Sequence, residues 1–212
     1  MQSQPILLVG LWVEDGEPHG SSARFRHLPD LMDSQGFTLA TVHASQVDAR
    51  ATAAAPPLGI ILSGSRHCLG EDCALDDFAE IAALLAALPS VPVLGICFGH
   101  QYLNVLAGGR VERFGVYRED PDFPIQHRGH PLFAGLPDPC KVAEDHGQRV
   151  AEPGAGYKVI ARSDDGIEAV EHADLPRIGV QFHPEYWPRQ RAPHGERVLR
   201  NWLGSVVRHR AK

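Results

Sequence analysis

Apolar residues recur along the first hundred positions in two alternating patterns. Short, largely β-branched runs are typical of strands that are buried on both faces, whereas apolar side chains spaced three or four residues apart indicate amphipathic helices. The predicted strands are 5–10, 37–43, 58–63 and 92–97, and the predicted helices are 76–88 and a segment within 22–34 that ends at Gly36. Strands that alternate with helices predict an α/β fold, with a mostly parallel central sheet flanked by helices.

The second half of the chain has a different pattern. Residues 141–144, 158–162, 167–171 and 178–182 predict a later run of strands, some of them antiparallel. A final helix over 196–207 would bury Leu199, Trp202, Leu203 and Val206. Residues 114–139 are rich in proline and lack periodicity, so we expect a loop there with at most one short strand.

Composition narrows the class of protein. The 212 residues predict a single domain over 1–212, and a hydrophobic content of 43% with 22% charged residues is ordinary for a globular protein. The net charge of −6 gives a nucleic-acid partner no electrostatic support. Neither a basic N-terminal region followed by an apolar stretch nor a run of roughly 18 apolar residues occurs, so we expect no signal peptide, no membrane span and a cytoplasmic location.

The cysteines and histidines do not indicate a metal site. The four cysteines are Cys68, Cys73, Cys97 and Cys140, and reduced thiols are the norm in the cytosol. His67 with Cys68 and Cys73 could suggest zinc, but no second pair at ligand spacing follows. We therefore expect neither a metal nor a cofactor.

Cys97 lies where a predicted buried strand passes directly into a helical pattern. A strand, a sharp turn and a helix form a nucleophile elbow, which lifts the sulfur above the carboxyl edge of the sheet and places it at a helix N-terminus. Partial positive charge there favours the thiolate, the nucleophilic form. Gly95 and Gly99 would let the turn close without a Cβ clash. A buried structural cysteine is the alternative interpretation, and the strand–turn–helix context argues against it.

A second segment supplies the partners that such a cysteine needs. Pro184 forces His183 into an extended conformation after the predicted strand 178–182, and side chains two apart on an extended segment share a face. His183 and Glu185 then point the same way, as a general base and the acceptor that orients it. His183 alone would more often be a surface or core histidine. Cys97, His183 and Glu185 together predict a catalytic triad.

These two motifs resemble those of the class I glutamine amidotransferases, the triad type of glutaminase. Residues 95–101 are Gly-Ile-Cys-Phe-Gly-His-Gln, and residues 181–185 are Gln-Phe-His-Pro-Glu. Residues 59–65, 145–147 and 157–172 are similar to the family's oxyanion turn, glutamine-facing loop and hairpin. The resemblance covers roughly residues 5–190 and implies a flavodoxin-like sheet with a cysteine nucleophile elbow.

The resemblance also implies a reaction. Cys97 would attack the side-chain amide of L-glutamine and form a γ-glutamyl thioester, releasing glutamate and ammonia for a separate synthase. Backbone N–H groups of Ser65 and Phe98 would form the oxyanion hole. Gly64, Gln101, Asp145 and Gly147 would contact the substrate. For the loop residues among these, ordinary turn chemistry is the alternative.

Two departures from the family pattern leave other functions open. The family's oxyanion turn often has Ser-Gly-Gly-Pro, whereas residues 63–66 are Ser-Gly-Ser-Arg. Relatives of the guanosine-monophosphate-synthetase type carry His-Gly-Asp, whereas residues 146–148 of this chain are His-Gly-Gln. Gln148 places direct docking to a synthetase of that type in doubt. A free-standing hydrolase of γ-glutamyl peptides or conjugates is therefore one alternative, with a wider pocket built from Arg66, residues 114–123 and Gln148. A non-enzymatic regulatory relative is another, against which the intact triad argues.

Overall fold

A seven-stranded sheet forms the centre of the computed structural model, which describes residues 4–11, 27–186 and 194–210. From one edge to the other the strands are β2 (Leu39–His43), β1 (Ile6–Gly10), β3 (Gly59–Leu62), β4 (Val93–Ile96), β9 (Arg177–Val180), β8 (Gly166–His172) and β7 (Tyr157–Ser163). The first five strands are parallel, and β8 is antiparallel to both of its neighbours. The predicted mostly parallel α/β sheet is confirmed.

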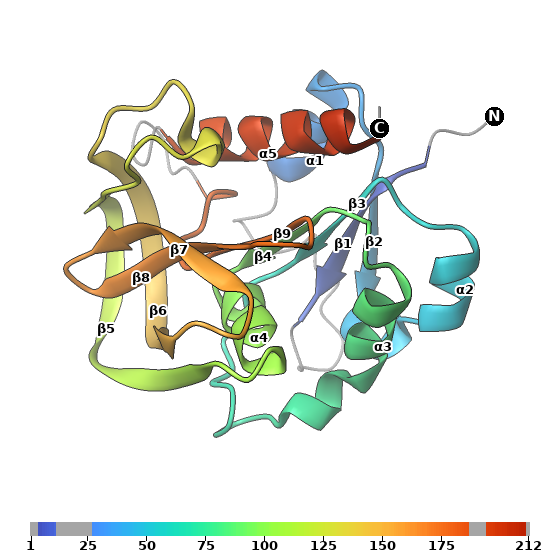
Figure 1. The fold of residues 1–212 in the computed structure, drawn as a ribbon, viewed down its shortest axis with the longest axis horizontal. Coiled ribbons are helices and arrows are strands. Elements are labelled where there is room, and N and C mark those ends of the chain that lie inside the picture. The colour runs from blue at the N-terminus through green and yellow to red at the C-terminus, as the bar shows by residue number, and fades with distance from the viewer. Residues whose placement is uncertain (1–3, 12–26, 187–193, 211–212) are drawn as a thin grey trace.

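Helices cover both faces of this sheet (Figure 1). On one face lie α1 (Leu28–Ser34) and α5 (Gly195–Arg210), and on the other lie α2 (Ala49–Ala54), α3 (Ala79–Ala87) and α4 (Phe98–Leu106). Each face has its own apolar core, since successive strand residues point to opposite faces. Ile61 of β3 therefore packs with Trp202 of α5, whereas Ile60 and Leu62 pack with the helices opposite.

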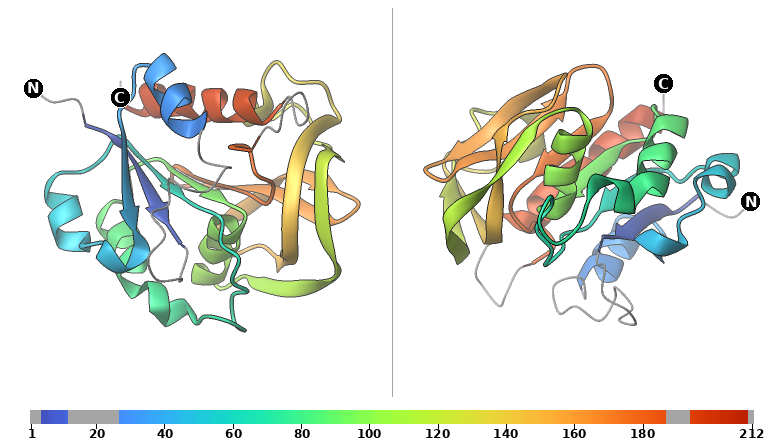
Figure 2. Two further views of the ribbon diagram at one scale, coloured as in Figure 1. Left: turned by 180° about the vertical axis from the view of Figure 1, so that it is seen from behind. Right: turned by 90° about the horizontal axis from the view of Figure 1, so that it is seen from below.

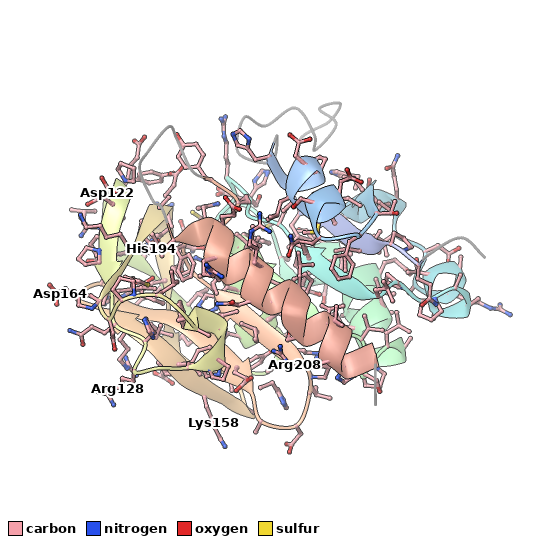
Figure 3. All side chains as sticks on the ribbon, turned by 90° about the horizontal axis from the view of Figure 1, so that it is seen from above. Asp122, Arg128, Lys158, Asp164, His194 and Arg208 are labelled. Carbon is pink, nitrogen blue, oxygen red and sulfur yellow. The ribbon has the colours of Figure 1, made fainter. Side chains whose placement is uncertain are left out.

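The C-terminal helix lies where the sequence pattern predicts it. The helix α5 includes the whole predicted range 196–207, and its residues Leu199, Trp202, Leu203 and Val206 are buried. Figure 3 shows this helix lying across the sheet, with His194 at its start. The ring Nδ1 of His194 accepts a hydrogen bond of 2.8 Å from the backbone N–H of Lys141, which ties the start of α5 to the strand that contains Lys141. The other predicted helices also form: α3 lies within 76–88, and α1 covers 28–34, while positions 22–26 of that prediction lie outside the described residues.

The prediction for residues 114–139, a loop with at most one short strand, was wrong for the first half of that range. Most of its first half belongs to β5 (Arg110–Ile125), which pairs with β6 (Cys140–Glu152) in a separate antiparallel ribbon. The ribbon stands at the β7 end of the main sheet (Figures 1 and 2). Most residues of β5 are half-buried or exposed, and the pairing is interrupted by register shifts, so neither a continuous apolar run nor a strict alternation marks the strand. The strand β6 extends well beyond the predicted 141–144 because its buried positions include the polar residues His146 and Gln148, so no apolar alternation marks it.

The helix α2 was not predicted either. It has six residues, of which only Ala49 is buried, so no apolar stripe marks it. Its start is fixed by Asp48, whose carboxylate accepts a 2.8 Å hydrogen bond from the N–H of Ala51. Three short 3-10 turns complete the described elements, at Ala44–Gln46, Leu75–Phe78 and Pro131–Phe133. Within the described ranges, no helix is long and apolar enough to cross a membrane.

Candidate active site

Cys97 lies at the sharp turn between β4 and α4. Its backbone has φ 49° and ψ −100°, a conformation that L-residues rarely adopt and that recurs at functional sites. A Cβ on Gly95 would lie 2.6 Å from the backbone of Gly99, and a Cβ on Gly99 would lie 2.4 Å from the carbonyl oxygen of Leu62. Only glycine fits at either position, as the sequence predicts for a nucleophile elbow.

His183 and Glu185 follow β9 and form a buried pair beside this cysteine. The backbone N–H of His183 donates to the carbonyl of Ala143 at 2.8 Å, and its ring Nδ1 lies 2.7 Å from Oε1 of Glu185. Since Nδ1 faces the carboxylate, Nε2 is the ring nitrogen that remains for the thiol. The structure thus brings together the three residues that the sequence selects as a triad.

The pKa of His183 shows which forces act on this pair. Burial by itself would lower the pKa of the imidazole, but the charges of Glu185 and Cys97 and hydrogen bonds to both raise it to about 10. The imidazolium is therefore the favoured form when the Cys97 thiol is ionised. An imidazolium beside the sulfur is an acid that can return a proton to a leaving group.

A pocket of about 620 Å³ opens beside the sulfur. Five of the predicted site residues line it: Ser65, Cys97, Gln101, Asp145 and Gly147. Gln101 belongs to α4, and Cys97 directly precedes that helix. Asp145 and Gly147 belong to β6, and Ser65 lies in the segment after β3. Residues from widely separated parts of the chain therefore converge here, at the carboxyl ends of the parallel strands, where open α/β sheets bind ligands.

The two remaining predicted residues have different surroundings. A Cβ on Gly64 would lie 2.8 Å from Cε1 of His183 and 3.6 Å from Cβ of Cys97, so Gly64 provides the space in which these two side chains meet. The ring of Phe98 is buried in the core, 5.5 Å from the ring of Phe78. Its backbone N–H belongs to the first residue of α4, so it has no acceptor within the helix.

Some pocket residues come from the unpredicted ribbon. Tyr117 and Glu119 of β5 lie within the range 114–123 that the sequence offered as part of a wider pocket, whereas Arg113 of β5 and His146 of β6 were not selected as site residues from the sequence. The phenol of Tyr117 donates to the carboxylate of Asp145 across the two strands. The long-range pairing of β5 with β6 was the signal needed to find them, and no local pattern encodes it.

Gln148, the residue that departs from the family pattern, has a structural role. Its side chain is buried, accepts a 2.9 Å hydrogen bond from the N–H of Leu69 and donates to the carbonyl of the same residue at 3.2 Å. An amide can serve both groups at once, whereas a carboxylate can only accept. Gln148 therefore fastens the pocket loop around Leu69 to β6.

Two carboxyl groups, those of Glu144 and Glu168, are almost fully buried near the pocket residue His146. Burial raises the pKa of Glu144 to about 8, and burial followed by the charge of Glu144 raises the pKa of Glu168 well above its usual value. The hydroxyl of Ser163 donates to Glu168 at 2.5 Å, and Nε2 of His146 lies 3.2 Å from Oε2 of Glu144. Burial thus disfavours the charged form of both carboxyls. In the described part of the chain, no group of three or more His, Cys, Asp or Glu side chains is arranged to hold a metal ion.

This chain resembles known proteins in both sequence and fold. The family model "Glutamine amidotransferase class-I" matches residues 30–205. A glutamine-hydrolysing GMP synthase of Lactococcus lactis is 38% identical over 152 residues, which cover 71% of this chain and 28% of that protein. A glutamine-hydrolysing GMP synthase subunit of Pyrococcus abyssi is 39% identical over 151 residues, 69% of this chain and 74% of that protein. The chain thus spans little more than a quarter of the Lactococcus enzyme and most of the Pyrococcus protein.

Among solved structures, a candidate GMP synthase subunit from Thermoplasma acidophilum has the same fold. Its TM-score is 0.78, with 20% sequence identity, and the match covers 98% of this chain and 96% of that one. At this identity the likeness concerns the fold alone. It covers the parallel sheet, the helices and the ribbon that together surround the pocket.

Proposed function

The chain belongs to the class I glutamine amidotransferase family, and we propose that it hydrolyses the side-chain amide of L-glutamine to glutamate and ammonia. The observation that carries this proposal is the meeting of Cys97, at a strained strand–helix turn, with the buried His183–Glu185 pair at the edge of a pocket. Family membership alone would leave open whether the chemistry is retained. A complete nucleophile, base and orienting acceptor supports that it is.

The reaction begins with the Cys97 thiolate. Its sulfur attacks the amide carbon of the substrate side chain, and the carbonyl electrons move onto oxygen to give a tetrahedral oxyanion. When that oxyanion collapses, the C–N bond breaks and His183 protonates the departing nitrogen, which leaves as ammonia. The γ-glutamyl group remains on the sulfur as a thioester. His183, now neutral, takes a proton from water, the resulting hydroxide attacks the thioester, and glutamate leaves as the thiolate is restored.

The oxyanion needs donors that are in place before the reaction. We assign this role to the backbone N–H of Phe98, which lies at the positive end of the α4 dipole, and to that of Ser65, which borders the pocket. One such donor typically lowers the barrier by about 3 kcal/mol. Gly64 contributes by having no side chain, because this leaves room for the ring of His183 to approach the sulfur.

The charged ends of the substrate would lie further along the pocket. Asp145 and Glu119 offer carboxylates for an α-ammonium group, and Arg66 offers a guanidinium for an α-carboxylate. Gly147 belongs to the same wall as Asp145, and we retain it as a substrate contact through its backbone. Gln101 contributes differently, because both of its amide hydrogens are donated to protein acceptors, at 2.8 and 3.2 Å. Its Oε1 is the atom left to face a ligand.

We further propose that the ammonia serves a separate synthase. The Pyrococcus relative, most of whose length this chain covers, is named as a subunit of GMP synthase. The acceptor here need not be the same, because Gln148 is committed to holding the pocket loop and no acid stands in its place. A cytoplasmic location fits the four cysteines, all of which are free thiols.

A γ-glutamyl hydrolase is the second candidate, and the size of the pocket favours it. A volume of about 620 Å³ lies in the middle of the range for pockets that take drug-sized ligands. A pocket of this size would hold a substituent on the leaving nitrogen in addition to the γ-glutamyl group. The first half of the chemistry is the same for both substrates, so the triad does not distinguish them.

Substrate preference separates the two functions. Glutamate release would be measured for the purified chain with L-glutamine and with a panel of γ-glutamyl dipeptides, each beside a Cys97→Ala control. We expect turnover of glutamine that exceeds turnover of the dipeptides and is lost in the control. Faster turnover of the dipeptides would establish the hydrolase instead, and glutamate release that survives Cys97→Ala would exclude both.

A further inference from the structure

One face of the Cys97 sulfur meets a side chain that the proposed mechanism does not use. The Nε2 atom of Gln181 lies 3.6 Å from Sγ, within hydrogen-bonding distance for sulfur. Gln181 directly follows β9, and its residue is almost fully buried. The contact is anchored by the backbone, because the N–H of Cys97 donates to the carbonyl of Val180 at 2.8 Å.

The orientation of the Gln181 amide follows from its neighbours. Whether nitrogen or oxygen faces the sulfur depends on a chain of bonds that starts at the backbone carbonyl of Gln148. A carbonyl can only accept, so the atom of Gln101 that lies 2.8 Å from it must be the nitrogen. That same nitrogen lies 3.2 Å from the next amide, so the atom of Gln181 facing it must be the oxygen. The N–H₂ group of Gln181 therefore points at the sulfur.

The Gln148 carbonyl is itself held in place. It also accepts a 2.9 Å hydrogen bond from Nδ1 of His146, so both of its lone pairs are directed into the site. Gln101 and His146 are almost fully buried, so little of either side chain is open to water. The result is a chain of hydrogen bonds that links the Gln148 carbonyl, through the amides of Gln101 and Gln181, to the sulfur of Cys97.

From this geometry we propose that Gln181 is a further catalytic residue, whose amide N–H stabilises the Cys97 thiolate, and that Gln101 and the Gln148 carbonyl are positioning groups that keep a donor turned toward the sulfur. The proposal rests on the glutaminase function proposed above. A donor to an ionised sulfur favours the charged form over the neutral thiol, because hydrogen bonds to charged groups are about twice as strong as neutral ones. His183 takes the proton, and Gln181 stabilises the sulfur that remains.

The ionisable groups around the sulfur and its pocket come from four parts of the chain. His183 and Glu185 follow β9, and Asp145 and His146 belong to β6. The strand β5 contributes Arg113, Tyr117 and Glu119, and the segment after β3 contributes Arg66, His67, Cys68 and Asp72. Substitution of Gln181 leaves all of them in place. A change in the ionisation of Cys97 in such variants can therefore be assigned to the lost donor, provided that the fold is kept.

The test is the pH dependence of Cys97 alkylation. Chloroacetamide, a small neutral electrophile, reacts with thiolates, and mass spectrometry of the Cys97 peptide separates this site from Cys68. We expect Gln181→Met, which lacks the donor, to raise the pH midpoint of alkylation by about one pH unit and to lower kcat roughly tenfold with little change in KM. Gln181→Glu, which turns an acceptor toward the sulfur, should raise the midpoint further.

A matched control is Asn201→Asp, the same amide-to-acid change in α5, where the amide donates to two carbonyls far from the pocket. Midpoints that stay at the wild-type value in both Gln181 variants, with thermal unfolding showing them folded, would overturn the proposal. If the midpoints shift but the wild-type chain does not hydrolyse glutamine, the thiolate contact stands and the glutaminase function fails. Gln101→Met, which removes the amide that orients Gln181, should shift the midpoint in the same direction, and no shift there would remove the positioning role.

Discussion

At the scale of single residues, the central quantity is the charge on His183. Burial favours the neutral imidazole, and the carboxylate of Glu185 at 2.7 Å together with the charge of Cys97 favours the imidazolium. The second effect wins, since the pKa of His183 is raised to about 10. A buried pair of opposite charges is stable only while both partners are present. The proposed base therefore depends on Glu185 both for its orientation and for its charge.

The Glu185→Gln substitution tests this dependence. An amide of the same shape leaves the packing intact but removes the charge and allows the wrong ring tautomer, so we expect kcat to fall by roughly 10³-fold. KM should change little, because Glu185 is buried and is not among the residues that line the pocket. Steady-state kinetics of glutamate release would measure both. An unchanged kcat in the folded variant would show that Glu185 does not support the base.

A second prediction concerns stability and pH. The folded-state pKa of Glu144 is raised from 4.5 to about 8 by burial, so its proton is bound more tightly in the folded chain than in the unfolded one. That contribution to stability is complete below pH 4.5 and is lost as the pH rises toward 8. In Glu144→Gln the loss is absent, so the melting temperature of the variant relative to wild type should increase from pH 5 to pH 9. A difference that does not depend on pH would contradict the raised pKa, and Glu119→Gln in β5, a carboxyl less deeply buried, is the control.

At the scale of elements, the elbow is held by close backbone packing. The turn at Cys97 approaches β3 and the His183 segment so closely that Gly64, Gly95 and Gly99 have no room for a Cβ. At Gly95 and Gly99 the obstacle is backbone, which cannot give way. At Gly64 the obstacle is the side chain of His183. A methyl group there would displace the ring and spare the fold.

Gly64→Ala should therefore separate activity from stability. The added Cβ would lie 2.8 Å from Cε1 of His183, so the ring must move and kcat should fall by at least about 10²-fold, since small misplacements of a reacting group have costs of that order. Thermal unfolding should change by only a few degrees. Gly204→Ala in α5, where the nearest side-chain atom is 3.4 Å away, is the control and should retain full activity. Full activity in Gly64→Ala would show that the ring does not occupy this position in the working enzyme.

The elements that the sequence predicted are those with strong local patterns. The buried strands and the elbow were predictable because apolar runs, glycine positions and the Cys97 and His183 motifs are all local. The ribbon of β5 and β6 was not predictable. Most of β5 is half-buried or exposed, β6 buries polar side chains, and the two strands pair over long range with register shifts. That Gly64 and Gln101 contact the substrate stays a prediction, but their neighbours in the fold could not be found from local patterns. Their close neighbours include His183 and Gln181, which are more than 75 positions away in the sequence.

At the scale of the whole molecule, the pocket is the space enclosed between the central sheet and the ribbon. The sheet supplies the chemistry, through Cys97 and His183, and the ribbon supplies a polar wall that includes Tyr117 and Asp145. Gln148 joins the two by holding the loop around Leu69 to β6. Substrate selection is therefore a property of how these parts are assembled. That the chain acts as one domain remains a prediction.

The central claim is that glutamine is hydrolysed through a covalent bond to Cys97. The most direct measurement is mass spectrometry of the chain after acid quenching during turnover of isotopically labelled L-glutamine. We predict a labelled γ-glutamyl group on the peptide that contains Cys97, absent in Cys97→Ala. Release of labelled glutamate with no adduct at Cys97, and with activity retained in Cys97→Ala, would contradict the account.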